Sequence, residues 1–243
     1  FNSDIKIFKD NFYTIDFDNV IRAISSKNGN ELWNFQTENS FIKSEKKLSI
    51  AIKDEIIFFV NNLGDVTALD VNNGSLVWQT PTQTNTIYQN AFSLENSDLV
   101  FENNTIYFSN NKNEFFSIDA RTGTVKWAQS INSSLRPTII ENLIFTVSNE
   151  GFLFIIDDPT GNIIRITDVL KNFKDKLEIK PIGFIHAKNK VYVSLNNGRL
   201  VTINTATGIQ ENVTKINNSK ISRPYILNNS MYLIKDNGLA KIE

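Results

Sequence analysis

The chain has 243 residues, 41% of them hydrophobic, and its 25 Lys and Arg nearly balance its 26 Asp and Glu. That apolar content is enough for a sizeable core and excludes a disordered chain, and a net charge of −1 without runs of Lys or Arg excludes a nucleic-acid partner. Zero Cys and one His exclude structural zinc, thiolate catalysis and iron–sulfur clusters, and no run reaches the roughly 18 apolar residues of a membrane-spanning helix.

The ends of the sequence bear on its domain organisation. The chain begins at Phe1, and its only Met is Met231. We therefore expect residues 1–243 to form a single domain of a longer parent chain, with any targeting segment outside this sequence.

Five short segments repeat along the chain and share a turn that contains glycine. They are AISSKNGNELW (23–33), ALDVNNGSLVW (68–78), SIDARTGTVKW (117–127), IIDDPTGNIIR (155–165) and TINTATGIQEN (202–212), with the glycine at Gly29, Gly74, Gly123, Gly161 and Gly208. Polar turn residues follow a strand, and glycine supplies the positive φ that the turn needs. Trp33, Trp78 and Trp127 share one position on the outgoing strand, where we expect each to pack one unit against the next.

A second turn precedes each repeated segment. Its shared position is occupied by Gly64, Gly151 and Gly198 in three copies and by Asn19 and Asn113 in the other two. Asn is the residue that best replaces glycine at positive φ. Two β-rich runs lie before this turn, such as 48–52 with Ile56–Val60, and 182–186 with 191–195. Their imperfect alternation of polar and apolar residues predicts strands covered on both faces.

Each unit therefore has four predicted strands in about 45 residues, which is typical of a β-propeller blade. Blade 1 begins near Ile5 and blade 5 ends near Val213. A sixth copy runs from Arg223 through 231–234 and 237–238 to Ile242 and stops after its third strand. The sequence predicts an all-β fold, a β-propeller of four-stranded blades with six blade repeats visible in one domain.

Two of the repeats carry a family resemblance. GDVTALDVNNGSLVW (64–78) and NEFFSIDARTGTVKW (113–127) resemble the repeat of pyrroloquinoline-quinone (PQQ)-type β-propellers. Among these, the chain is similar to the BamB family, eight-bladed periplasmic lipoproteins that take part in outer-membrane β-barrel protein assembly. The resemblance implies a non-enzymatic scaffold that has no cofactor and binds the POTRA domains of BamA. It also implies attachment to the outer membrane only through a lipidated N-terminal Cys, which this sequence does not contain.

The same resemblance implies partner-binding residues. In that family a Ser-Leu-Arg string after a middle blade and acidic residues before the next blade contact the partner, and Leu135, Arg136 and Glu178 match these positions. Leu135 would supply an apolar anchor, and Arg136 a charge-assisted contact to a partner carboxylate. Two positions depart from the family: Pro137 follows where Gly-rich residues are expected, and Lys176 stands at a second acidic position.

Two segments between blades are longer than a propeller requires. Residues 80–98 contain Tyr88, Phe92 and Leu94. Residues 165–180 place apolar side chains at helical spacing, namely Ile166, Val169, Leu170, Phe173 and Leu177. This spacing predicts a short amphipathic helix that covers the seam between blades 4 and 5, or alternatively an element that docks a partner. Arg165 and Asn212 replace the repeated Trp in blades 4 and 5, so these seams lose their aromatic anchor.

The sequence also bears on functions other than a scaffold. Quinone-dependent dehydrogenases share the repeat but carry a vicinal Cys pair, so we expect no enzyme in a chain without Cys. A propeller that binds a ligand or acts as a sensor remains the alternative. Asp16 and Asp18 resemble the start of a calcium loop, but Ile21 occupies its glycine position, which favours a simple turn. His186 has no second His to share a metal, so we expect a half-buried strand residue.

Overall fold

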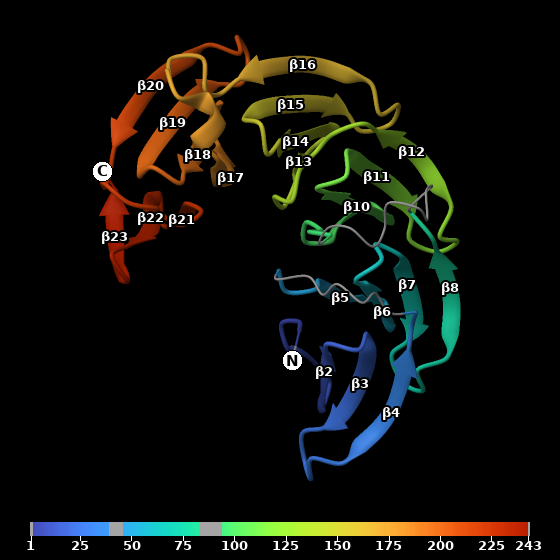
Figure 1. The fold of residues 1–243 in the computed structure, drawn as a ribbon. Coiled ribbons are helices and arrows are strands. Elements are labelled where there is room, and N and C mark those ends of the chain that lie inside the picture. Colours follow the sequence, from blue (N-terminus) through green and yellow to red (C-terminus); the bar gives the residue numbers. More distant parts are fainter. Residues whose placement is uncertain (1, 39–45, 83–93, 243) are drawn as a thin grey trace. The chain divides into compact units, whose positions relative to one another are not determined.

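The computed structural model describes residues 2–38, 46–82 and 94–242 of this protein. Contacts between Cα atoms divide the chain into two units, Phe1–Ser130 and Ile131–Glu243. The described residues form 23 β-strands and a short 3₁₀ helix, which confirms the predicted all-β class (Figure 1). Within these residues, no helix is long and apolar enough to cross a membrane.

The first unit contains three antiparallel blades of four strands each, and the strands of each blade follow one another in chain order. Blade 1 comprises β1 (Lys6–Phe8), β2 (Asn11–Ile15), β3 (Val20–Ser25) and β4 (Glu31–Gln36). Blade 2 comprises β5 (Ile50–Lys53), β6 (Ile56–Val60), β7 (Val66–Asp70) and β8 (Leu76–Thr80). Blade 3 comprises β9 (Val100–Glu102), β10 (Thr105–Asn110), β11 (Glu114–Asp119) and β12 (Val125–Gln129).

The second unit contains two further four-stranded blades and one sheet of three strands. Blade 4 comprises β13 (Thr138–Ile140), β14 (Leu143–Val147), β15 (Phe152–Asp157) and β16 (Ile163–Asp168). Blade 5 comprises β17 (Pro181–Ala187), β18 (Lys190–Leu195), β19 (Arg199–Asn204) and β20 (Gln210–Lys215). Blade 6 comprises β21 (Tyr225–Leu227), β22 (Ser230–Lys235) and β23 (Gly238–Ile242), which are the three strands predicted for the sixth copy.

The turn between the third and fourth strands is the same in each complete blade. In blade 2, the Asp70 side chain accepts a hydrogen bond from the Asn72 amide at 2.7 Å, and the Asp70 main-chain oxygen accepts one from the Gly74 amide at 2.9 Å. Gly74 has φ +72°. Asn19 and Asn113, which replace glycine in the second turn, have φ of 58° and 63°. The structure thus confirms the conformation predicted for both turns.

Burial follows strand position within a blade. In blades 2 and 3 the second and third strands are buried on both faces, as in β10. The fourth strands β4, β8 and β12 alternate between exposed and half-buried residues. Hydrophobic cores form between blades 1 and 2, between blades 2 and 3, and between blades 4 and 5. In the second unit one cluster includes Phe145, Leu170, Phe184 and Val193, and Leu135 packs against it from the segment before blade 4.

The segment 165–180 is not a helix, so that prediction is wrong. Strand β16 continues to Asp168, whose carboxylate accepts a hydrogen bond from the Leu170 amide at 2.8 Å and turns the chain. Val169 then donates its amide to the Gly151 oxygen of the same blade. Only the short 3₁₀ helix η2 (Lys176–Glu178) follows. Of the apolar residues at helical spacing, Val169 and Leu170 are buried and Phe173 packs on the core, but Ile166 and Leu177 are 54% and 97% exposed.

The segment 80–98 is described only at its two ends. Thr80 ends β8, and Leu94 is buried. Tyr88 and Phe92 lie outside the described residues.

Candidate partner-binding surface

Trp33 and Trp78, two of the three repeated Trp residues, contact the glycine turn of the following blade. The Trp33 ring lies so close to Gly74 that a Cβ there would be 2.6 Å from the ring atom Cε3, and Nε1 donates a hydrogen bond to the Val71 oxygen at 3.2 Å. Trp78 repeats the arrangement with Gly123 and donates to the Ala120 oxygen at 3.0 Å. A glycine is therefore required both for its positive φ and for the close approach of the indole.

The other predicted structural residues show variations on this contact. Gly29 has φ +73°, but no atom lies within 4 Å of the position of a Cβ. Trp127 stacks on Phe115 within its own blade, with ring centroids 5.9 Å apart. Gly161, with φ +73°, donates its amide to the oxygen of Asp157 at 2.8 Å.

Arg165 occupies the Trp position of blade 4 and bridges to blade 5. Its Nη1 donates to the Thr205 oxygen at 2.6 Å, and its Cδ would be 2.8 Å from a Cβ on Gly208. Thr205 corresponds to Val71 and Ala120 in the repeat, so the hydrogen bond is retained while the aromatic ring is lost. The seam between blades 4 and 5 lacks the aromatic anchor, as expected, and holds the Arg165 hydrogen bond in its place.

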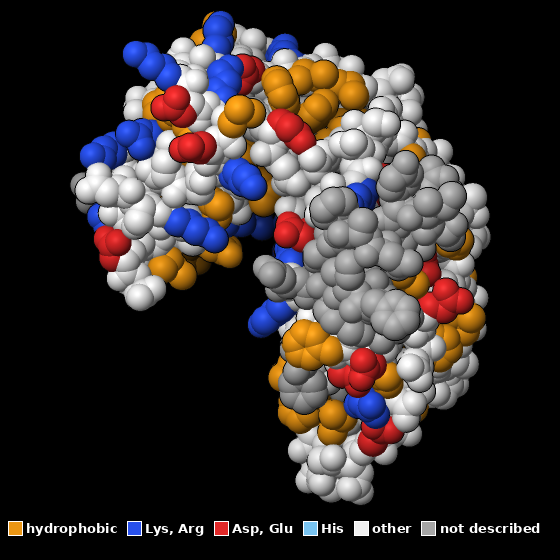
Figure 2. All heavy atoms as spheres, viewed as in Figure 1, with side chains coloured by type: hydrophobic (Ala, Val, Ile, Leu, Met, Phe, Trp, Pro, Cys, Tyr) orange, Lys and Arg blue, Asp and Glu red, His pale blue; other side chains and the backbone are white. Residues whose placement is uncertain are grey.

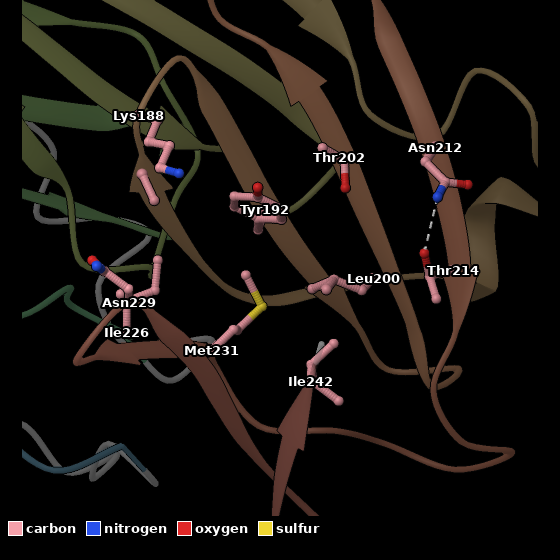
Figure 3. A pocket seen from close by; sticks show the side chains of 11 residues that line it. Lys188, Tyr192, Leu200, Thr202, Asn212, Thr214, Ile226, Asn229, Met231 and Ile242 are labelled. Carbon is pink, nitrogen blue, oxygen red and sulfur yellow. Dashed lines mark hydrogen bonds between the residues drawn. The ribbon is translucent and has the colours of Figure 1, made fainter.

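In blade 5 the same position holds Asn212. A pocket of about 520 Å³ lies here, lined by residues of blades 5 and 6 (Figure 3). Its polar wall contains Tyr192, Thr202 and Asn212, which are opposite one another on β18, β19 and β20. Asn212 donates to the Thr214 hydroxyl at 3.2 Å. Met231 and Ile242 of blade 6 line the apolar side.

Leu135 and Arg136 are held beside the turn between β14 and β15. The buried Ser133 hydroxyl donates to the Val147 oxygen at 2.8 Å and accepts the Leu135 amide at 3.2 Å. Leu135 is half-buried against the core, whereas Arg136 is exposed. The backbone thus directs the charged side chain outward while the leucine contributes to packing.

Glu178 lies in the next connecting segment and is held in the same manner. Asn196, in the turn between β18 and β19, donates its side-chain amide to the Glu178 main-chain oxygen at 2.9 Å, leaving the carboxylate exposed. Phe173 and Ile179 of this segment pack on the core cluster that Leu135 also contacts. The two predicted contact segments are therefore supported by one core, at the end of the sheets where the blades are joined.

The exposure of the Leu177 side chain is not predicted by the sequence pattern. It is 97% exposed beside Glu178, although its spacing predicted a buried helix face. The adjacent Lys176 forms an ion pair with Asp168 at 2.7 Å. We define the candidate surface as Leu135, Arg136, Leu177 and Glu178, an apolar and charged set suited to a protein partner.

The residues considered for metal binding have other roles. The Asp16 carboxylate accepts the amides of Asp18 and Val20 at 2.9 and 3.0 Å, which is turn chemistry. His186 is half-buried on β17 with its ring 4.9 Å from that of Phe145, and burial lowers its pKa. Within the described ranges, no three His, Asp or Glu side chains are grouped so that they could hold a metal ion.

The chain is similar to known proteins in both sequence and structure. The family model described as outer membrane protein assembly factor BamB matches residues 2–167. The crystal structure of BamB from Moraxella catarrhalis is similar with a TM-score of 0.76 and 16% identity, covering 98% of this chain and 70% of that chain. No curated protein sequence matches.

Two other solved structures share the fold. The computationally designed Ika8 protein matches with a TM-score of 0.72 and 13% identity, over 98% of this chain and 70% of that one. The quinohemoprotein alcohol dehydrogenase ADHIIG from Pseudomonas putida HK5 matches with a TM-score of 0.62 and 11% identity, over 87% of this chain and 41% of that one. The fold therefore occurs in an enzyme and in a designed protein, and by itself does not assign a function.

Proposed function

This chain belongs to the family of the outer membrane protein assembly factor BamB, and we propose that it is a non-enzymatic scaffold that docks a partner protein during outer-membrane β-barrel protein assembly. The family match is the observation that carries the proposal. The partner would be the POTRA domains of a BamA-like protein. The parent protein would lie in the periplasm, tethered to the outer membrane by an N-terminal lipid anchor, and residues 1–243 would belong to one propeller domain.

The mechanism is rigid presentation of the candidate surface. Hydrogen bonds from Ser133 and Asn196 fix the two connecting segments, so little conformational entropy is lost when a partner binds. Leu177 is exposed in the free chain and would be buried in the complex. Arg136 and Glu178 carry opposite charges, so a partner would place a carboxylate against the first and a cation against the second.

Binding of the purified chain to POTRA fragments tests this proposal. We expect Leu177→Ser and Arg136→Glu each to weaken binding about tenfold, as for an anchor residue of moderate strength. Arg121→Glu is the matched control, because Arg121 is likewise exposed but lies in the first unit. Wild-type chain that does not bind POTRA fragments would overturn the function. Binding that survives both variants would overturn the site but retain the function.

A ligand-binding module is the second candidate, and the pocket between blades 5 and 6 favours it. Its Tyr, Thr and Asn side chains could hydrogen-bond a sugar or a peptide. Calorimetric titration with such ligands distinguishes the two functions, because the scaffold needs no ligand there. Saturable binding that is lost in Tyr192→Phe with Asn212→Ala would favour the module.

A further inference from the structure

The near-neutral net charge conceals an uneven distribution of charge along the chain. Residues 171–242 hold 12 Lys and Arg against four Asp and Glu, a net charge of +8, whereas the whole chain has −1. This basic region comprises blades 5 and 6 and the segment that precedes them. Figure 2 shows Lys and Arg side chains gathered over the part of the molecule that carries β18–β20.

A continuous set of contacts places many of these charges at one end of the two sheets. Asn196 donates its amide to the Lys180 oxygen at 2.9 Å, and the Gly198 oxygen accepts the amides of Ile216 and Asn217, both at 3.0 Å. Asn217 in turn donates to the Asp236 carboxylate at 2.9 Å. The connecting segments before blades 5 and 6 therefore adjoin the turns that follow β18 and β22. The basic surface that these elements form consists of Lys180, Arg199, Lys215, Lys220 and Lys235.

Two of these basic residues face each other on neighbouring strands. Arg199 and Lys215 are directly opposite on β19 and β20. Like charges directly opposite each other destabilise a sheet, so this pair lowers the stability of the fold. Arg199 donates Nη1 to the Asn197 oxygen at 3.0 Å. Among the described residues, none of the five basic side chains forms an ion pair with an acidic one.

We infer that the basic surface is a second docking site, whose occupant is an acidic segment or acidic face of a partner protein. Charge complementarity is the first argument, because Lys180, Lys215 and Lys220 are exposed and, within the described part of the chain, unpaired, and such cations raise the association rate with an acidic partner. The second is the interruption of the surface by Glu178 and Asp236, which a protein can match with individual cations but which would repel a uniformly anionic membrane. Leu177, beside Glu178, adds an apolar contact at the border of the surface.

The inference requires neither a POTRA domain nor Arg136, and the basic surface adjoins the candidate surface at Leu177 and Glu178. The probe is a short fluorescent peptide rich in Glu with two Leu, titrated by anisotropy against the purified chain at low and high salt. Polyglutamate without Leu, and vesicles containing phosphatidylglycerol, are tested in parallel. We expect the Leu-containing peptide to bind most tightly, with an affinity that falls as salt rises.

Charge-reversal variants test where on the chain the acidic peptide binds. We expect Lys215→Glu with Lys220→Glu to weaken peptide binding about tenfold, the effect of losing two charge pairs of ordinary strength. Lys188→Glu with Lys241→Glu makes the same change in net charge on exposed residues of the same unit, near the opposite end of the sheets. We expect this control to bind within about twofold of wild type.

Thermal unfolding separates lost binding from lost folding. Lys215→Glu converts the like-charged pair with Arg199 into an ion pair, so this variant should melt at a higher temperature while it binds less. Equal loss of binding in both double variants would show a general charge effect and overturn the surface. Preferential binding to the vesicles would overturn the protein partner, and equal binding of polyglutamate and the Leu-containing peptide would overturn the apolar contact at Leu177.

Discussion

The guanidinium of Arg165 donates a hydrogen bond to the main-chain oxygen of Thr205 at 2.6 Å, in the position where two other blades use an indole. Trp33 and Trp78 make the corresponding bonds to Val71 and Ala120. In blades 1, 2 and 4 the repeat therefore keeps a donor that bridges to the next blade, supplied by an indole or by a guanidinium.

Arg165→Ala should lower the free energy of unfolding by about 1–2 kcal/mol, the lower part of the range for a charged donor because Arg165 is only half-buried. Arg165→Trp should restore most of the loss by re-creating the contact of blades 1 and 2. Arg121→Ala, on an exposed residue, should change stability by less than about 0.5 kcal/mol. Urea denaturation measures all three, and an unaltered Arg165→Ala would show that the bridge is dispensable.

Substitution of two glycines distinguishes the cost of backbone strain from the cost of a packing clash. Gly29 and Gly74 have nearly equal φ, +73° and +72°, but only Gly74 faces an indole. Gly29→Ala should cost roughly 1–2 kcal/mol, from the left-handed conformation alone. Gly74→Ala should cost about 1–3 kcal/mol more, because its Cβ would clash with Trp33. If denaturation gives equal losses, the Trp33 contact is not as close as described.

Two leucines test the conformation of the segment after β16. Leu170 is 1% exposed and Leu177 is 97% exposed. Leu170→Ala should cost about 2–5 kcal/mol, as for a core leucine, whereas Leu177→Ala should change stability by less than about 0.5 kcal/mol. A helix that buried both side chains would make the two losses similar, so chemical denaturation of the pair decides between helix and turn.

The chain has one histidine, so its NMR signal needs no assignment and the pKa of its ring can be measured directly. Burial lowers the pKa of His186 from 6.5, because the charged imidazolium is disfavoured near Phe145. The unfolded chain therefore binds the proton more tightly, and His186 contributes stability that is present above pH 6.5 and is lost as the pH falls towards the folded pKa. NMR titration of the His186 ring should show a midpoint below 6.5. His186→Gln should flatten the decline in melting temperature below pH 6.5. A midpoint at or above the ordinary value would refute the burial.

The repeat could be predicted because its signals are local. Glycine or Asn at a turn indicates a positive φ, so the sequence alone predicts the conformation of Asn19 and Asn113. Strand number followed from the period, and blade 6 had the three strands expected. These features depend on residues that are neighbours in the sequence.

The remaining features depend on contacts that spacing does not encode. Val169 and Leu170 are buried together because the chain turns at Asp168, and a turn after a strand can imitate helical spacing. The role of Arg165 required the position of the Thr205 oxygen, in another blade. Likewise, the net charge of the whole chain did not reveal the basic region, because acidic residues elsewhere in the sequence cancel it.

Hydrogen–deuterium exchange of the chain with and without a POTRA fragment tests the scaffold most directly. Docking on the candidate surface should slow exchange in residues 131–136 and 169–180, because a bound partner covers the segments that carry Leu135, Arg136, Leu177 and Glu178. The strands of blades 1 and 2 should exchange at the same rate in both samples. A complex that leaves both segments unprotected, or that protects only another part of the chain, would contradict the account.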